Sequence, residues 1–344
     1  MQINLERCLV MIMVFITTFS SCDRIQKTVL TEDGPNVSQT TTLTITGGNP
    51  GGSFSPFAMA ISDIVTQSAP HLAITFKASP GSVENTRRVN ANSNYLGVAF
   101  ASESYLGYHG QEIFAEEGSK TNLRAVTLLY IAYAQAIVLA DSDIHQFTDF
   151  VGKKIATGRL GSGSAQTLER LARSTGIWEQ ITPVYTSTTE GANGLRDRTV
   201  DVFQWLVSVP NDTIMQLTTT NDIRMIDMDA PAQASGFYEQ YPFYQPGTIP
   251  EGAYGGKVEP VRTLLMPTLL IAHKEVQAET VYAILKQIYT PEGLQAMIVA
   301  TGGAAAAMAV ENASKAFVIP LHRGAYKFWS EQDVEIPAHT IPVD

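Results

Sequence analysis

Residues 124–140 read RAVTLLYIAYAQAIVLA, an apolar run longer than a single buried strand usually is. A second long apolar run, TLLMPTLLIA, follows at residues 263–272. We predict that 124–140 forms two strands joined by a bend, where the chain crosses from one lobe of the protein to another. The run at 263–272 then returns the chain to the first lobe. Two crossings between two lobes are typical of a hinged clamshell.

Around these runs, short apolar stretches alternate with helical patterns, which favours an α/β fold with largely parallel sheets. Each half opens with a strand, a glycine-rich loop and a helix. Strands are predicted at 42–46, 72–78, 95–101, 153–158, 183–187, 200–206 and 223–228, and the first two helices at 55–68 and 82–92. A further helix follows the loop GRLGSGSA, and Gly176 is predicted to end it. The predicted organisation is a signal peptide (1–21), a flexible tether (22–41), lobe 1 (42–135 plus 273–338) and lobe 2 (136–272).

The composition fits a globular body and limits its partners. Of the 344 residues, 44% are hydrophobic and 16% charged, which allows a full core in one or two domains. The net charge of −10 argues against a nucleic-acid-binding protein, which usually shows a basic face. Both cysteines, Cys8 and Cys22, precede the body, so it has no disulfide framework and no cysteine-based zinc site.

The first residues predict export. The apolar run from Leu9 to Phe19 is shorter than the ~20 residues that span a bilayer, and it matches a cleaved signal peptide. Ser20 and Ser21 directly precede Cys22, as in bacterial lipoprotein signals, where that cysteine is lipidated. We expect lipidation of Cys22; the alternative is an ordinary secretory signal with a chance cysteine. The polar stretch that follows predicts a tether to the body.

Three loops that follow strands and open helices predict a ligand site. They lie within ITGGNPGGSFSPFAMAISDIV (45–65), PGSVENTRR (80–88) and GRLGSGSA (158–165). The first N–H groups of a helix are unpaired, and the helix dipole favours an anion beside them. In the second loop, Ser82 with Asn85 is placed to cap the helix. Each loop alone is also ordinary capping chemistry, but three of them in two matched lobes favour an anion-binding cleft.

Motifs for catalysis, nucleotides and metals are weak or absent. The sequence around Ser162 lacks the glycine spacing of a nucleophile elbow, and the six histidines are scattered. Phosphate-binding motifs of the G-x-G-x-x-G and P-loop types do not occur. Asp141 and Asp143 fit solvated turn residues better than calcium ligands. We therefore predict no catalytic residue, no cofactor and no metal site, with an exported serine hydrolase as an alternative.

Six stretches resemble the TAXI-type solute-binding proteins, the extracytoplasmic receptors of TRAP transporters, and occur in the same order over residues 42–330. They are TGGNPGGSFSPF, SPGSVENTRRV, DFVGKKIATGRLGSGSAQT, DVFQWLVSVPN, YPFYQPGTIPEGAYGG and VIPLHRGAYKFW. The resemblance implies a two-lobed, type II-like periplasmic-binding-protein clamshell. It also implies that the protein closes on a small carboxylate, such as glutamate or a 2-oxo or hydroxy dicarboxylate, and delivers it to a TRAP permease in the membrane.

The resemblance also implies which residues bind the ligand. By position these are Gly51, Gly52, Ser53 and Phe54 in the first loop; Ser82, Val83, Glu84, Asn85 and Arg87 in the second; Tyr130 in the crossing segment; and Gly161, Ser162, Gly163 and Ser164 in the second lobe. The chain departs from the family pattern at Pro50, at Phe54-Ser55 (two tyrosines in many members), at Arg159-Leu160 and at Arg323. These departures leave the identity of the ligand open.

The residues suggest how a carboxylate is held. We expect Arg159 and the N–H groups of 161–164 to bind one end, while Ser53, Ser82 and Asn85 fix the other; as an alternative, Arg159 is an ordinary surface arginine. Phe54, Tyr130 and Trp205 are candidates to line the cleft. A sensor that reports its ligand to a separate membrane partner is the second functional alternative.

Overall fold

A computed structural model describes residues 40–343, and the predicted signal peptide, the lipidation site and nearly all of the tether lie outside this range. Its strands are β1 (Thr41–Thr46), β2 (Leu72–Lys77), β3 (Tyr95–Phe100), β4 (Leu123–Leu139), β5 (Lys154–Gly158), β6 (Thr182–Thr186), β7 (Val202–Val207), β8 (Ile223–Ile226), β9 (Gln245–Ile249) and β10 (Val261–His273). Its helices are α1 (Phe54–Ser68), α2 (Ser82–Ala91), α3 (Ala101–His109), α4 (Gly163–Ser174), α5 (Thr188–Arg196), α6 (Asp212–Thr220), α7 (Asp229–Ala234), α8 (Phe237–Gln240), α9 (Ala278–Ile288), α10 (Pro291–Ala300) and α11 (Arg323–Glu331). Six short 3₁₀ helices complete the order: η1 (Glu112–Phe114), η2 (Phe147–Phe150), η3 (Trp178–Gln180), η4 (Ala304–Ala307), η5 (Val310–Ala316) and η6 (Ala338–Thr340).

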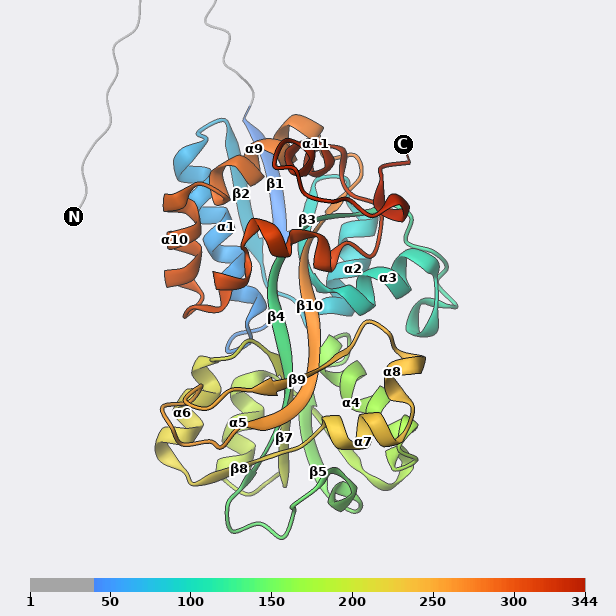
Figure 1. The fold of residues 1–344 in the computed structure, drawn as a ribbon, viewed down its shortest axis with the longest axis vertical. Helices are drawn as coiled ribbons and strands as arrows, with labels where there is room; N and C mark the ends of the chain where they lie inside the picture. Colours follow the sequence, from blue (N-terminus) through green and yellow to red (C-terminus); the bar gives the residue numbers. More distant parts are fainter. Residues whose placement is uncertain (1–39, 344) are drawn as a thin grey trace, which may run out of the picture. The chain divides into compact units, whose positions relative to one another are not determined.

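The strands form one connected sheet with the order β2-β1-β3-β10-β4-β7-β5-β6; β8 pairs with β4 and β9 with β10. Pairing is parallel within β2-β1-β3 and within β7-β5-β6, as expected for α/β units. The two central strands, β4 and β10, run antiparallel to each other and to their neighbours. In Figure 1 they pass between the elements around β1–β3 and those around β5–β8. The two-lobed fold with two crossing segments is therefore confirmed, whereas the predicted lobe bounds stay a prediction.

The prediction of two strands joined by a bend at 124–140 is wrong, because Leu123–Leu139 forms the single strand β4. Strand β10 pairs with β4 from Leu123 to Tyr133, with register shifts beside Thr268 and Leu270. Beyond Tyr133, β7 and β8 pair with the other end of β4. Local irregularities in pairing let a long strand twist without breaking. Pairing with partner strands along both of its edges therefore stabilises β4 at a length greater than the residue propensities alone predict.

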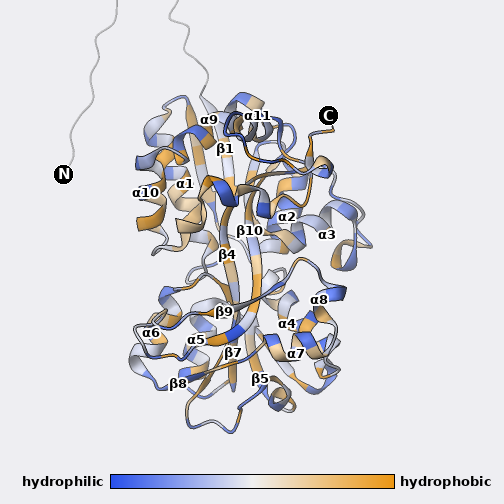
Figure 2. Cartoon of the chain, in the orientation of Figure 1, coloured by the Kyte–Doolittle hydropathy of each residue, from blue (hydrophilic) through white to orange (hydrophobic). Residues whose placement is uncertain are grey.

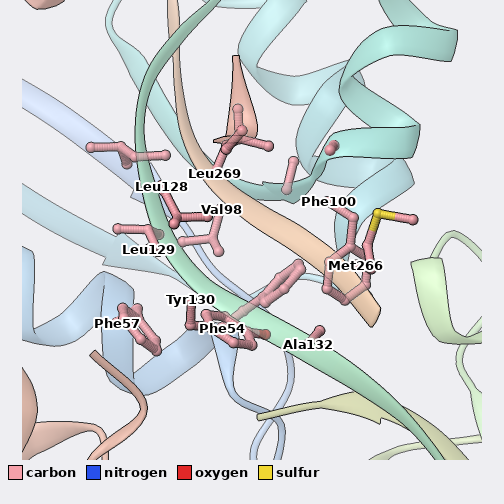
Figure 3. Packing of buried hydrophobic residues seen from close by; sticks show 14 of the residues in the cluster. Phe54, Phe57, Val98, Phe100, Leu128, Leu129, Tyr130, Ala132, Met266 and Leu269 are labelled. Carbon is pink, nitrogen blue, oxygen red and sulfur yellow. The ribbon is translucent and has the colours of Figure 1, made fainter. Parts of the chain in front are cut away.

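Helices cover the sheet, and the core lies between the layers. Figure 3 shows side chains from α1, β3, β4 and β10 packed together, among them Phe57, Leu129 and Leu269. The ring of Phe57 stacks on Tyr130 with centroids 4.8 Å apart. In Figure 2, hydrophilic and hydrophobic stretches alternate along the outer helices, as expected for amphipathic helices on a core. None of the helices described here is long and apolar enough to cross a membrane.

Most predicted elements are confirmed to within a few residues, with two exceptions near the site. Helix α3 was not predicted; it begins directly after β3, at Ala101. Helix α2 has Gly81 at its N-cap and no side-chain cap, so the expected capping by Ser82 and Asn85 is wrong. The predicted end of α4 is confirmed, since Gly176 follows the helix with a φ of 74°, a left-handed conformation that suits glycine.

Candidate functional site

The N-termini of four helices meet at one cavity of about 30 Å³. Helices α1 and α2 come from one lobe, and α4 and α5 from the other. The cavity is lined by Gly48, Asn49, Gly52, Ser53, Phe54, Pro80, Gly81, Ser82, Phe100, Ser162, Gly163, Ser164, Thr188, Trp205, Leu206 and Val207. This volume fits one or two water molecules, so a larger ligand requires the lobes to separate for entry.

No charged side chain lines this cavity within the described residues. Its polar groups are hydroxyls, one amide side chain and the backbone N–H groups of helix starts. The dipole of each helix places about half a positive charge at its N-terminus. The lining therefore suits a small anion or a strongly polar neutral group held by hydrogen bonds, without an arginine or lysine in contact.

The first loop contacts the opposite lobe directly. The Oγ atoms of Ser53 and Ser208 lie 2.9 Å apart, and the backbone N–H of Ser208 also donates to Ser53 Oγ at 2.9 Å. The Asn49 Oδ1 accepts hydrogen bonds from the N–H and the hydroxyl of Thr188, at 3.3 and 3.2 Å. These bonds join residues that are more than 130 positions apart. The structure thus shows the two lobes in contact on this side of the cavity.

Close backbone packing joins the lobes at the other predicted loops. The N–H of Glu84 donates to the carbonyl of Gly161 at 3.1 Å. A β-carbon on Gly163 would overlap the ring of Phe100 and lie 3.0 Å from Glu103 Oε2. Gly163 is therefore required for the close approach of α4 to β3 and α3.

The buried polar residues of the second loop mainly hold the protein together. The Asn85 side chain accepts from Thr46 Oγ1 at 2.8 Å and donates to the carbonyls of Gly47 and Val98, both at 2.7 Å. The Ser82 Oγ accepts from the N–H of Phe100 at 2.8 Å. Asn85 thereby fixes the first glycine loop from behind, while Ser82 lines the cavity itself.

Serines of the second lobe have a similar double role. The Oγ of Ser162 accepts from the N–H of Ala165 and so caps α4, as its position in the sequence suggests. The Oγ of Ser164 accepts from the N–H of Leu206 at 3.1 Å. Both hydroxyls keep their own proton for donation. Both residues belong to the lining of the cavity.

Tyr130 lies on the hinge strand β4, beneath the first loop. It is 1% exposed, and its hydroxyl makes no hydrogen bond of regular geometry among the described residues, although Thr268 and Ser53 lie near enough to lower its pKa against the larger effect of burial. The hydroxyl of Thr268, which is opposite Tyr130 on β10, is also buried and makes no such hydrogen bond. Burial raises the pKa of Tyr130 above its ordinary value, so the phenol stays protonated. Tyr130 does not line the cavity.

Several predicted residues lie elsewhere. Arg159 is half exposed and pairs with Glu190 at 3.2 Å, outside the cavity lining. Arg87 pairs with Glu117. Val83 is buried in a small cluster with Leu106 and Phe114; Gly51 and Gly161 belong to the contacting loops without lining the cavity. Gly52, Ser53, Phe54, Ser82, Ser162, Gly163, Ser164 and Trp205 are brought together around it.

Sequence reasoning missed half of the lining, namely Gly48, Asn49, Pro80, Gly81, Phe100, Thr188, Leu206 and Val207. A signal for Thr188 was present, because Ser187 and Glu190 form a capping box that opens a helix directly after a predicted strand. The same pattern of strand, loop and helix was the basis for predicting the other three loops as ligand loops. Phe100 had no such signal, since it reads as an ordinary strand residue.

A buried ion-pair cluster, also missed, joins α4 to the first lobe. Arg170 donates from Nη1 to Glu103 Oε1 at 2.8 Å and lies 2.9 Å from Glu112 Oε2. The Arg170 and Glu103 side chains are only 4% and 0% exposed. Burial opposes the charge of Arg170, but Tyr244, Glu103 and Glu112 together raise its pKa above the ordinary value. Arg170 is therefore a permanent buried cation.

Nothing within residues 40–343 suggests a metal or an obvious catalytic pair. No group of three or more possible metal-ligating side chains occurs there. No histidine belongs to the lining of the cavity in the described part of the chain. The lining serines therefore have no imidazole base next to them, which the hydrolase alternative would need.

Comparisons with known proteins agree with this architecture. The model of the NMT1-like family matches residues 45–332. Among solved structures, MatC from Rhodopseudomonas palustris with bound malate is 13% identical, covers 84% of this chain and 97% of its own, and has a TM-score of 0.52. The periplasmic binding protein BugD is 12% identical over 84% and 94% of the two chains, with a TM-score of 0.50. At these identities the likeness shows the fold, which is that of periplasmic binding proteins.

Proposed function

The chain belongs to the NMT1-like family, and we propose that it is an exported solute-binding protein that closes on a small organic acid. The ligand enters between the lobes and is captured when they close about the hinge strands β4 and β10. Both lobes then contact the same molecule. A ligand shifts the open–closed balance only through contacts that the closed form alone provides.

One observation carries this proposal. The N-termini of α1 and α2 in one lobe and of α4 and α5 in the other line a single cavity without a charged side chain among the described residues. A carboxylate placed there accepts hydrogen bonds from backbone N–H groups and serine hydroxyls of both lobes. The solved structure of MatC contains malate, which supports the choice of small acids as the first ligands to test.

The finer assignments are part of the proposal. We assign the protein to the TAXI group on the strength of the ordered motifs, with a TRAP permease as its membrane partner. We place it outside the cytoplasmic membrane, anchored through a lipid on Cys22. A Cys22→Ser variant is then expected in the soluble periplasmic fraction instead of the membrane fraction; an unchanged membrane fraction would contradict the anchor.

Thermal unfolding against a panel of acids tests the binding function. The panel contains glutamate, 2-oxoglutarate, 2-hydroxyglutarate, succinate, malate, pyruvate and sulfate. A ligand at ~1,000 times its dissociation constant stabilises by ~4 kcal/mol, and each kcal/mol raises the Tm by roughly 2–4 °C. We expect a clear increase in Tm with at least one acid, and a flat panel would contradict the acid class.

A variant pair shows whether the binding uses this cavity. Gly163→Ala places a methyl group against Phe100 and prevents the lobes from meeting there, so the ligand-induced shift in Tm should be lost. Gly194→Ala is the matched control, because it lies on α5 and its nearest neighbours, Thr199 and Val200, belong to the same lobe. Equal shifts in both variants would place the binding site elsewhere.

A further inference from the structure

The ion-pair cluster of Arg170, Glu103 and Glu112 spans the two lobes. Glu103 lies in the first turn of α3 and Glu112 in the short helix η1, whereas Arg170 lies on α4. The N-terminus of α4 lines the cavity, and the Glu103 carboxylate lies directly behind Gly163 at that terminus. In Figure 1, α3 and α4 lie on one side of the hinge strands, and α5 and α6 on the other.

Contacts around the cluster reinforce its position between the lobes. The Tyr244 hydroxyl accepts from Arg170 Nη1 at 3.2 Å and lies 2.9 Å from the hydroxyl of Thr167. Next to it, the rings of Tyr105 and Phe243 meet across the lobes with centroids 4.9 Å apart. The cation is thus enclosed by polar and aromatic groups contributed from both sides.

Because buried charges are costly unless they are paired, the free energy of this cluster depends on whether the lobes are open or closed. When the lobes separate, Arg170 leaves the two carboxylates and all three groups return to water. When the lobes meet, the desolvation cost is offset only if the opposite charges are correctly paired. A single charge left without its partner in the closed form is therefore strongly unfavourable, whereas removal of both charges is tolerated.

We propose that Arg170, Glu103 and Glu112 form a latch that assembles as the lobes close. The proposal rests on the hinge closure described above. Arg170 is a positioning residue: it does not line the cavity, and it acts by bringing the N-terminus of α4 onto the first lobe in one orientation. The latch makes the closed form dependent on charge pairing on the side opposite to the Ser53–Ser208 contact.

A cross-linking assay measures closure without any ligand. The substitutions Ser53→Cys and Ser208→Cys in the full chain, together with Cys8→Ser and Cys22→Ser, report closure because the native Oγ atoms of Ser53 and Ser208 are 2.9 Å apart. The rate of disulfide formation is followed with copper phenanthroline as the oxidant. This reporter is combined with Arg170→Met, with Glu103→Gln and with both changes together.

Arg170→Met leaves the buried Glu103 carboxylate unpaired and should slow cross-linking at least tenfold, whereas Glu103→Gln leaves Arg170 paired with Glu112 and should slow it less. The double variant should recover to within about threefold of the parent rate. Arg173→Met is the matched control: Arg173 lies on the same helix but pairs with Glu169 and Glu179 of its own lobe, and its rate should not change. A parent-like rate in Arg170→Met, or a double variant as slow as Arg170→Met alone, would overturn the latch.

Thermal unfolding of the reduced variants separates a latch from a merely structural ion pair. Because the latch opens with the lobes, the single variants should unfold within a few degrees of the parent protein. A large decrease in Tm for Arg170→Met that Glu103→Gln does not reverse would assign the pair to folding and overturn the proposal. The cross-linking result does not depend on the acid panel, so either proposal can fail alone.

Discussion

Ser53 and Ser208 contact each other through side chains 2.9 Å apart although 155 positions separate them in the sequence. One residue precedes α1 in the first glycine loop, and the other follows β7 in the opposite lobe. The pair closes one side of the cavity. It also shows that the glycine loop, which is ordinary helix-capping sequence, acts as a contact between lobes.

Ser53→Ala should weaken ligand affinity by roughly three- to tenfold, since a hydrogen bond contributes about 0.5–1.5 kcal/mol. The variant removes the acceptor for the Ser208 N–H and a hydroxyl at the cavity. Isothermal titration with the acid found in the panel measures the change. Ser68→Ala, at the exposed end of the same helix, is the control and should bind as the parent does. Equal affinities for both variants would refute a role for Ser53.

Asn85→Ala should lower the free energy of unfolding by about 2–4 kcal/mol, because it removes three buried hydrogen bonds, to Thr46, Gly47 and Val98. Urea denaturation of the ligand-free protein gives the value. The control is Asn92→Ala, whose exposed side chain donates one hydrogen bond to the Arg88 carbonyl. A loss below 1 kcal/mol for Asn85→Ala would show that this network is not structural.

Arg159→Ala should change ligand affinity by less than about twofold. The structure places this guanidinium half exposed, in an ion pair with Glu190, and exposed pairs contribute roughly 0–1 kcal/mol. Titration with the same acid decides between this expectation and the carboxylate clamp suggested by the sequence. A decrease in ligand affinity by a factor of ten or more would show that Arg159 contacts the ligand, as the sequence suggested.

Glu190 should contribute to stability in a pH-dependent way. Hydrogen bonds from Ser187, first from its backbone N–H, hold the pKa of the Glu190 carboxyl below its ordinary value, with a smaller effect of Arg159. A group with a lowered folded pKa stabilises above its unfolded pKa of about 4.3 and loses that contribution as the pH falls through the folded value. The Tm difference between the parent and Glu190→Gln should therefore be constant above about pH 5.5 and shrink below about pH 4. A difference that grows in acid would contradict this sign.

Local patterns were sufficient for most elements of the fold. Alternation of apolar runs and amphipathic segments predicted the parallel units, and the helix end at Gly176 followed from its left-handed preference. Two long apolar runs were enough to predict the crossings. The bend inside 124–140 was wrong because sheet partners along both edges, and not local propensity, set the length of β4.

By itself, the sequence determined which loops open helices, and therefore where unpaired N–H groups occur along the chain. That property is local, because caps, glycines and dipoles act within one turn. Only the tertiary structure determines which of these loops contact one another. It also determines that Arg159 pairs with Glu190 and that Arg170 pairs with Glu103. Those outcomes depend on how two lobes approach each other around β4 and β10, a long-range geometry that no short stretch of residues encodes.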